Sequence, residues 1–156
     1  MNLFAYGTLM TPDGLRAALD GKRVDSLRFV PARLSGWRRV WNVYRDEWLG
    51  GVLNLESAPG SSAVGVLVSG LAEEDLARLD AQEATHLPRE TVYVEPAGGE
   101  PVVAQLYWRR RGNHQGRPSA TYLTTVLARA REAGPEVYES LRAGTVDPSG
   151  APLLLA

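Results

Sequence analysis

The sequence predicts an α+β fold, because its strand-like segments outnumber its helical ones and the two kinds do not alternate regularly. Most regular segments show the alternating or β-branched and aromatic patterns of strands, and only two or three show a helical period. A parallel α/β sheet needs repeated βαβ units, which this order of segments does not supply. We expect the 156 residues to form one domain, residues 1–156, with a C-terminal tail from about residue 143.

The first third of the chain predicts a strand, a short helix and then long strands. Residues 2–6 are mostly apolar, as in a buried strand, and residues 12–19 have a helical pattern. Residues 24–44 are rich in Val, Leu, Phe, Trp and Tyr with interspersed Arg, which suits long twisted strands. We expect these strands to bend at Pro31 and at Ser35-Gly36.

The middle of the chain predicts two more strands and a helix. Gly50-Gly51 precedes a strand over residues 52–55, and another strand follows over residues 64–71. Residues 58–62 between them contain Pro, Gly and Ser and predict a loop. An acidic cluster then opens a helix over residues 73–83, where carboxylates meet the positive end of the helix dipole.

The last third of the chain predicts a hairpin and two helices. Its strands and helices are expected over residues 90–95, 102–108, 119–131 and 136–142. The Ser119 hydroxyl can cap the first of these helices, and Gly134-Pro135 ends it. The tail contains the apolar residues 153–155, which could pack on the domain or against a second copy in a homodimer.

The charge balance indicates small-molecule partners. The chain has 17 basic and 18 acidic side chains and a formal net charge of −1, so no overall field attracts nucleic acid or an anionic membrane. The cluster Arg109-Arg110-Arg111 is either a solvated loop or the rim of a pocket that attracts a carboxylate. No stretch reaches the length of a membrane span, and we expect a soluble cytoplasmic protein.

The absence of cysteine restricts the chemistry to oxygen and nitrogen groups. It excludes disulfides, thiolate metal sites and a cysteine nucleophile. The two histidines, His86 and His114, lack the spacing of metal ligands, and no serine lies in a nucleophile-elbow pattern. We therefore expect neither a metal site nor a serine-based catalytic triad.

The N-terminal strand ends in a segment that is suited to bind an anion. The N–H groups of Gly7, Thr8 and Leu9 lie beyond the strand, and glycine lets a ligand approach the backbone closely. If residues 11–13 open a helix, its positive end would face the same place. The alternative is an ordinary turn between a strand and a helix.

Three segments, in the same order, resemble one protein family. They are Tyr6-Gly7-Thr8-Leu9, Leu79-Asp80-Ala81-Gln82-Glu83 with Arg89 and the strand-like residues 91–94, and Pro118-Ser119-Ala120-Thr121-Tyr122-Leu123. From residue 3 to about residue 133, this set resembles the γ-glutamylcyclotransferase-like family, also called AIG2-like or γ-glutamylamine cyclotransferase-like. The resemblance implies a small mixed β-barrel flanked by helices, with a pocket at one mouth.

The resemblance also implies an intramolecular reaction. The α-amine of a γ-glutamyl amide attacks its own γ-carbonyl, which forms 5-oxoproline and releases an amine. By this resemblance Glu83 is the catalytic general acid and base, and no metal or organic cofactor takes part. The substrate-binding residues that it implies are Tyr6, Gly7, Thr8, Leu9 and Tyr122.

The residue pattern alone leaves the roles of Glu83 and Tyr122 open. Glu83 follows Leu79 by four residues on the buried helical face, but this also fits a boundary residue whose carboxylate reaches solvent or pairs with Arg89. Tyr122 is either a core residue or a hydrogen-bond donor to the substrate. For the whole chain, the alternative to an enzyme is a diverged, non-catalytic domain that binds a carboxylate-bearing metabolite. A carboxylate buried beside apolar or aromatic side chains has a raised pKa and is a stronger base. We expect such side chains around Glu83 to be Leu79 and some of Tyr6, Trp41, Tyr44 and Tyr122.

Overall fold

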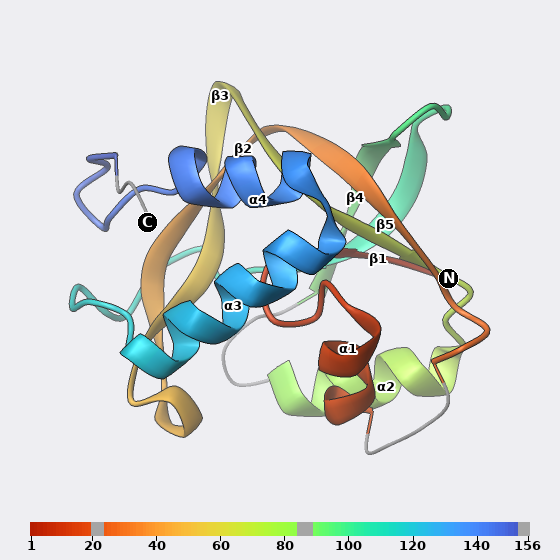
Figure 1. Cartoon of the computed structure of the whole chain (residues 1–156), viewed down its shortest axis with the longest axis horizontal. Helices are drawn as coiled ribbons and strands as arrows, with labels where there is room; N and C mark the ends of the chain where they lie inside the picture. The colour runs from red at the N-terminus through yellow and green to blue at the C-terminus, as the bar shows by residue number, and fades with distance from the viewer. Residues whose placement is uncertain (20–23, 84–88, 153–156) are drawn as a thin grey trace.

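The computed structural model describes residues 1–19, 24–83 and 89–152, and Figure 1 shows how they are arranged. Five strands lie within these ranges: β1 (Asn2–Ala5), β2 (Arg28–Arg45), β3 (Gly50–Ser69), β4 (Arg89–Pro96) and β5 (Val102–Tyr107). The helices within them are α1 (Pro12–Ala18), α2 (Glu73–Glu83), α3 (Ala120–Ala133) and α4 (Pro135–Gly144), with a short 3-10 turn, η1 (Asp46–Trp48). The apolar residues 153–155 of the tail lie outside the described residues.

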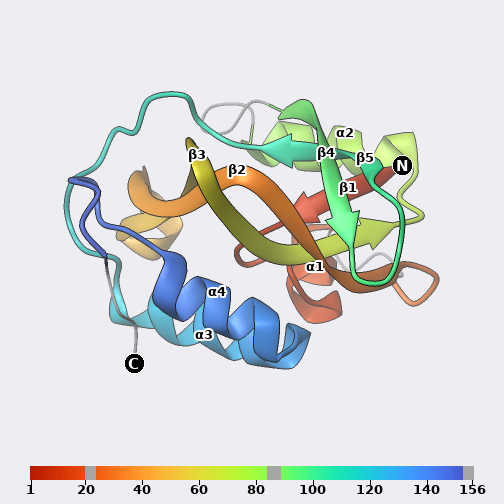
Figure 2. The ribbon, with the colours of Figure 1, turned by 90° about the horizontal axis from the view of Figure 1, so that it is seen from above.

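The strands form a closed barrel in the order β1-β3-β2-β4-β5. Neighbouring strands run antiparallel, except where β5 returns to β1 and pairs with it in parallel around Leu3 and Gln105. The barrel is therefore mixed, and helices flank it on more than one side (Figure 2). This confirms the α+β class and the small mixed β-barrel flanked by helices.

The β2–β3 hairpin corrects the loop that was expected at residues 58–62. These residues belong to β3, because β2 remains the partner strand on both sides of them: Trp37 pairs with Ser57 and Ser35 pairs with Ser62. The extra residues of β3 opposite Gly36 form a bulge, and Gly36 has a φ of +84°, which favours glycine. The turn-forming residues thus shift the register of the ladder without ending it, at Ser35-Gly36, where the sequence predicted a bend.

The tip of the same hairpin is compact. The 3-10 turn Asp46–Trp48 follows β2 directly, and Leu49 then adopts the left-handed conformation, with φ 51° and ψ 40°, before β3 begins. This tight connection carries Arg45, Glu47 and Trp48 at one end of the barrel. The same end holds the last residues of β1 and β5 because these two strands are parallel.

Helices α3 and α4 lie side by side against the barrel (Figure 2). The Ser119 hydroxyl accepts a hydrogen bond from the Tyr122 N–H at 3.2 Å, which confirms the predicted N-cap of α3. Tyr122, Val126 and Ala130, which recur at helical spacing, are buried on one face of this helix. Helix α3 ends at Gly134, as the sequence predicted, and α4 begins at Pro135, one residue before the predicted start.

Helices α1 and α2 meet near their C-terminal ends. Leu76 and Leu79 of α2 are buried in the core, as expected from the helical period. The side-chain amide of Gln82 donates a hydrogen bond to the carbonyl of Ala18, the last residue of α1. These two helix ends therefore stand together beside the end of the barrel that carries the β2–β3 tip.

Candidate functional site

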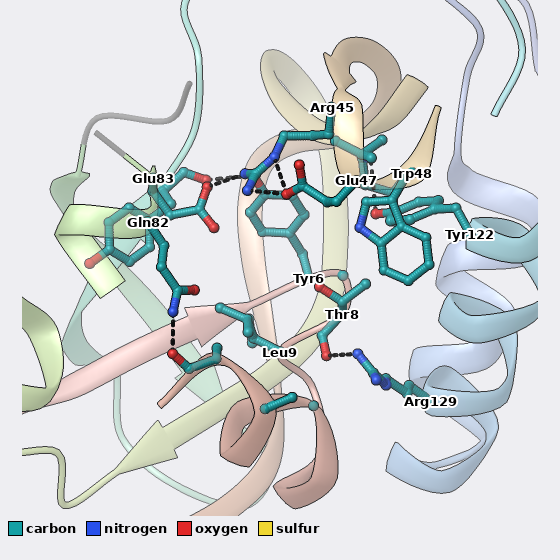
Figure 3. A pocket seen from close by; sticks show the side chains of 18 of the residues that line it. Tyr6, Thr8, Leu9, Arg45, Glu47, Trp48, Gln82, Glu83, Tyr122 and Arg129 are labelled. Carbon is teal, nitrogen blue, oxygen red and sulfur yellow. Dashed lines mark hydrogen bonds and ion pairs between the residues drawn. The ribbon is translucent and has the colours of Figure 1, made fainter. Parts of the chain in front are cut away.

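A pocket of about 470 Å³ lies where the ends of β1, α1 and α2 meet α3 and the β2–β3 tip (Figure 3). All six residues that the sequence analysis assigned to a site line it: Tyr6, Gly7, Thr8, Leu9, Glu83 and Tyr122. The structure adds further lining residues that the sequence analysis did not assign, among them Arg45, Glu47, Trp48, Tyr107 and Arg129. The tertiary fold thus brings three segments that are distant in sequence to one cavity.

The loop after β1 is held through its carbonyl groups. The carbonyls of Tyr6, Gly7 and Thr8 accept hydrogen bonds from Arg39 Nε (2.9 Å), the Met10 N–H (3.3 Å) and Arg129 Nη1 (2.6 Å), respectively. In a trans peptide, the carbonyl of one residue and the N–H of the next point in opposite directions. The N–H groups of Gly7, Thr8 and Leu9 are therefore turned away from these donors, and they have no acceptor in the described part of the chain. Such a row of amides suits an anion.

Arg39 anchors this loop although its side chain is buried, with 1% of its surface exposed. Besides the Tyr6 carbonyl, its guanidinium donates to the Val64 carbonyl at 2.7 Å and to the Ser140 hydroxyl at 3.1 Å. Burial lowers the pKa of Arg39 to about 10, so the group is still charged at neutral pH. In the sequence, Arg39 is one of the arginines interspersed in the strand-like residues 24–44, and no spacing pattern marks it as buried.

The N-terminus of α1 does not line the pocket, contrary to expectation. The helix contributes Gly14, Ala17 and Ala18, which lie further along it. At its start, the Thr11 hydroxyl accepts a hydrogen bond from the Gly14 N–H at 3.3 Å, and Pro12 has no N–H. Because Thr11, Pro12 and Asp13 do not line the pocket and the Gly14 N–H is capped, the start of α1 offers the cavity no free backbone donor.

Glu83, the last residue of α2, reaches into the pocket and pairs with Arg45. Its Oε2 lies 2.8 Å from Arg45 Nη1, and 14% of its side chain is exposed. Figure 3 shows the carboxylate on the side of the cavity opposite Thr8 and Arg129. The carboxylate is thus shielded from bulk solvent while it faces the cavity.

Arg45 joins Glu83 to a second carboxylate, that of Glu47, whose Oε1 lies 2.5 Å from Arg45 Nη2. Burial alone would lower the pKa of Arg45, but the attraction of Glu83 and Glu47 outweighs it and raises the pKa above its ordinary value. The guanidinium therefore stabilises the ionised form of both acids. The sequence analysis missed Arg45, because it lies 38 residues from Glu83 and no motif includes it.

Arg89, which the sequence left open as one possible partner of Glu83, pairs with Asp80 instead. The Nε of Arg89 lies 3.1 Å from Asp80 Oδ1. The same carboxylate oxygen of Asp80 accepts a hydrogen bond from the Tyr107 hydroxyl at 2.6 Å. Asp80 lies one turn before Glu83 on α2, and Arg89 forms its ion pair with this residue.

The aromatic walls of the pocket differ in part from those expected. Of the expected walls, Tyr6 and Tyr122 line the cavity, together with Trp48 and Tyr107. Leu79, which was also expected, does not line it, and neither do Trp41 and Tyr44. Burial, followed by the influence of Glu83, raises the pKa of Tyr6, and burial together with the hydrogen bond to Asp80 raises the pKa of Tyr107. Both hydroxyls are neutral, and that of Tyr6 donates to the Tyr107 carbonyl.

Tyr122 is both a core residue and part of the pocket wall. Its ring packs edge-on against Trp41 and Trp48, with centroid distances of 5.6 Å and 5.1 Å. Its hydroxyl oxygen accepts a hydrogen bond from the Leu53 N–H at 3.1 Å. Burial raises the pKa of Tyr122, which keeps the hydroxyl protonated and able to donate.

Two other groups considered in the sequence lie away from the pocket. The cluster Arg109-Arg110-Arg111 is absent from the described lining, and Arg110 is 77% exposed, in agreement with a solvated loop. His86 falls outside the described residues, and His114 packs beside the ring of Tyr44, at a centroid distance of 5.3 Å. Within the described ranges, His, Asp and Glu side chains form no group of three that could hold a metal ion.

The fold and the pocket define the chain as a small mixed-barrel protein whose cavity combines one shielded carboxylate with a row of backbone amides. Comparison with known families narrows this class. The model of the family "Gamma-glutamyl cyclotransferase, AIG2-like" matches residues 3–124, and the chain belongs to this family. A comparison with curated proteins found no match.

Solved structures share the fold at low sequence identity. A structure named γ-glutamyl cyclotransferase has a TM-score of 0.79 and 22% identity, and the match covers 95% of this chain and 89% of the other. An uncharacterized protein from Homo sapiens has a TM-score of 0.78, 22% identity and coverages of 94% and 89%. A γ-glutamyl cyclotransferase specific to glutathione, from yeast, has a TM-score of 0.51, 15% identity and coverages of 90% and 83%. At these identities the comparison establishes the fold alone.

The helices carry no sign of a membrane segment. None of those within residues 1–19, 24–83 and 89–152 is both long and apolar enough to cross a bilayer.

Proposed function

We propose that this protein cyclises a γ-glutamyl amide to 5-oxoproline and releases an amine or amino acid, with Glu83 as the general acid and base. One observation carries the proposal: a shielded carboxylate lines the same cavity as the loop of Gly7, Thr8 and Leu9, whose N–H groups have no acceptor in the described part of the chain. These are the two kinds of group that a γ-glutamyl compound needs, one for its α-carboxylate and one for the proton of its α-amine. Membership of the family supports the same reaction class.

The amides of Gly7, Thr8 and Leu9 would hold the α-carboxylate of the substrate. Backbone donors that are fixed before binding lose little entropy when the ligand arrives, and charge-assisted hydrogen bonds are the stronger kind. Once the carboxylate is anchored, the γ-carbonyl has to fold back toward the α-amine. Holding the two in a reactive geometry can supply about 7 kcal/mol or more of the barrier reduction in favourable cases.

Glu83 would move the proton. The substrate amine is mostly ammonium at neutral pH, and it gives a proton to the Glu83 carboxylate before its lone pair attacks the γ-carbonyl. A C–N bond forms in the five-membered ring, the amide C–N bond breaks, and the departing nitrogen takes the proton from Glu83. The second proton that the ring nitrogen loses also passes through Glu83 to the departing amine, which leaves as an ammonium ion, so Glu83 ends each turnover as a carboxylate. The pair with Arg45 favours the ionised form of Glu83, which is the form that accepts the first proton, but it also makes the carboxylate a weaker base than apolar walls alone would.

Tyr122 would close the pocket beside the reacting carbonyl. Its hydroxyl is neutral, and its oxygen already accepts from the Leu53 N–H, so its proton is directed by that bond. An O–H donor near a carbonyl stabilises the negative charge that develops on the oxygen during attack. We assign this supporting role to Tyr122 and the proton transfer to Glu83.

The test is release of 5-oxoproline from a panel of γ-glutamyl amino acids and γ-glutamyl amines. Turnover of any member supports the proposal, and the best substrate identifies the leaving group. No turnover across the panel, together with binding of 5-oxoproline or glutamate, would favour the alternative of a diverged, non-catalytic domain. The ion pair with Arg45 is the observation that favours a non-catalytic domain, because it already engages one oxygen of Glu83.

Replacing Gly7 with valine is expected to block the carboxylate site. A Cβ at this position would lie 3.4 Å from the Tyr122 hydroxyl and 3.9 Å from Leu53 Cβ, so alanine fits while the two methyl groups of valine must enter the cavity. We expect Gly7→Val to weaken 5-oxoproline binding by at least about tenfold, and Gly7→Ala to weaken it less. Titration calorimetry measures both, and normal binding by Gly7→Val would remove this loop from the site.

We further propose that residues 1–156 form a single domain, that the protein is cytoplasmic and that it forms a homodimer. Mass photometry or sedimentation of the purified protein addresses the oligomeric state, and the substrate panel addresses the leaving amine.

A further inference from the structure

Arg129 on α3 makes a contact with the site loop that the sequence did not indicate. Its Nη1 donates to the Thr8 carbonyl at 2.6 Å, across 121 residues of sequence. The side chain is half-buried, and within the described part of the chain it pairs with no carboxylate. Its positive charge is thus not neutralised by an acidic side chain, and it lies at the wall of the pocket (Figure 3).

Helix α3 presents Arg129 and Tyr122 to the same cavity because they are seven residues, or about two turns, apart. Figure 3 shows Arg129 beside Thr8, on the side of the pocket opposite Glu83. The helix therefore contributes to two parts of the site, a hydroxyl from Tyr122 and a guanidinium at the loop.

The contact requires the glycine at position 14. A Cβ on Gly14 would lie 1.9 Å from the Thr8 carbonyl oxygen and 2.9 Å from Arg129 Nη1. The first distance is far below any van der Waals contact, and the atom it meets is backbone. Gly14 of α1 thus leaves the space in which the Thr8 carbonyl and Arg129 meet, so three elements converge on a single hydrogen bond.

This bond fixes the orientation of one peptide group. Because the peptide between Thr8 and Leu9 is planar and trans, a carbonyl held toward Arg129 turns the Leu9 N–H to the opposite side. Without Arg129, the Thr8 carbonyl would have no donor from this helix, and the peptide could rotate its oxygen toward the cavity. An oxygen there would repel a carboxylate.

We propose that Arg129 is a positioning residue of the carboxylate site, which holds the Thr8–Leu9 peptide so that its N–H faces the ligand and adds one positive charge at that end of the pocket. The inference rests on the proposed function, since it assumes that the loop amides bind the α-carboxylate. Its effect is confined to ligands that carry this carboxylate. It acts on binding more than on the proton transfer at Glu83, which lies across the cavity.

The experiment compares Arg129→Met with Arg129→Lys and with Arg131→Met as the matched control. Arg131 lies on the same helix, where it contacts Tyr138, and it does not line the pocket. Each variant is titrated with 5-oxoproline and with its carboxamide, in which the carboxylate is replaced by a neutral amide. Thermal melts of all variants establish that they are folded.

We expect Arg129→Met to weaken 5-oxoproline binding by about tenfold or more and to leave carboxamide binding within about twofold. Arg129→Lys should recover part of the loss, and Arg131→Met should bind like wild type. With the best substrate, KM should rise while kcat stays within about threefold, because the lost interaction is ground-state binding. Added salt should weaken the binding of 5-oxoproline more in wild type than in Arg129→Met.

Equal losses for 5-oxoproline and its carboxamide, or no loss for either in folded Arg129→Met, would overturn the inference. If wild type turns over the panel and Arg129→Met binds normally, the inference fails and the proposed function stands. If wild type releases no 5-oxoproline but binds carboxylates in an Arg129-dependent manner, the proposed reaction fails and the inference stands. Gly14→Ala disturbs the same contact from α1 and keeps the charge of Arg129. At temperatures where this variant is folded, it should weaken the binding of 5-oxoproline more than the binding of its carboxamide.

Discussion

Replacing Glu83 with glutamine is expected to lower kcat for the best γ-glutamyl substrate by at least about 100-fold. The glutamine side chain keeps the shape of glutamate and can still accept a hydrogen bond from Arg45, but it cannot take the proton of the substrate ammonium. Binding of 5-oxoproline should stay within about threefold of wild type, because its carboxylate is held at the other side of the pocket. A discontinuous assay of 5-oxoproline release and calorimetric titration measure the two quantities.

The matched control is Glu73→Gln, the same change on the same helix at an exposed position of the first turn. It should retain wild-type turnover and wild-type binding. Turnover retained by Glu83→Gln would take Glu83 out of the proton transfer. Loss of both turnover and binding in a folded Glu83→Gln protein would mean that the carboxylate serves the pocket structure through Arg45, and this too would contradict the proposed role.

Replacing Arg39 with methionine is expected to destabilise the protein by about 2–4 kcal/mol, which lowers the melting temperature by about 5–15 °C in a chain of this size. The change leaves the buried carbonyls of Tyr6 and Val64 and the Ser140 hydroxyl without this donor, at about 1–3 kcal/mol each. It also removes a buried charge. A pKa of about 10 corresponds to a cost of about 3 kcal/mol for that charge, so part of the loss is offset.

Arg38→Met is the control for Arg39→Met. Arg38 is the next residue of β2, and it pairs with Glu56 across the hairpin at 2.6 Å, with about a third of each side chain exposed. Partly exposed ion pairs of this kind contribute roughly 0–1 kcal/mol, so the control should melt close to wild type. Equal melting temperatures for the two variants in differential scanning calorimetry would show that the buried guanidinium does not hold the fold together.

Loss of Arg39 should also affect the pocket. The Tyr6 carbonyl is one of the three that orient the loop peptides, and its release frees the peptide that carries the Gly7 N–H. A weaker affinity for 5-oxoproline is therefore expected in Arg39→Met even at temperatures where the protein is folded. Stability and binding are coupled through one guanidinium.

Local sequence patterns determined the type of nearly every element. The helical period identified the buried faces of α2 and α3, and the Ser119 cap and the Gly134-Pro135 boundary lie where the sequence predicted. These features depend on residues that are close in sequence, since a helix repeats every 3.6 residues and its caps bond within one turn. The loop expected at residues 58–62 was wrong, because the pairing of β3 with β2 continued through residues that favour a turn.

The sequence by itself also identified the six candidate residues, Tyr6, Gly7, Thr8, Leu9, Glu83 and Tyr122, and all of them line one pocket in the structure. Only the tertiary structure decided what holds them in place. Arg39, Arg45 and Arg129 reach the Tyr6 carbonyl, Glu83 and the Thr8 carbonyl across 33, 38 and 121 residues. An arginine has a long side chain with five donors, and it bonds whichever acceptor the closed barrel brings within about 3 Å. No periodic pattern in the sequence indicates these acceptors, because barrel closure and burial determine which of them lies within reach.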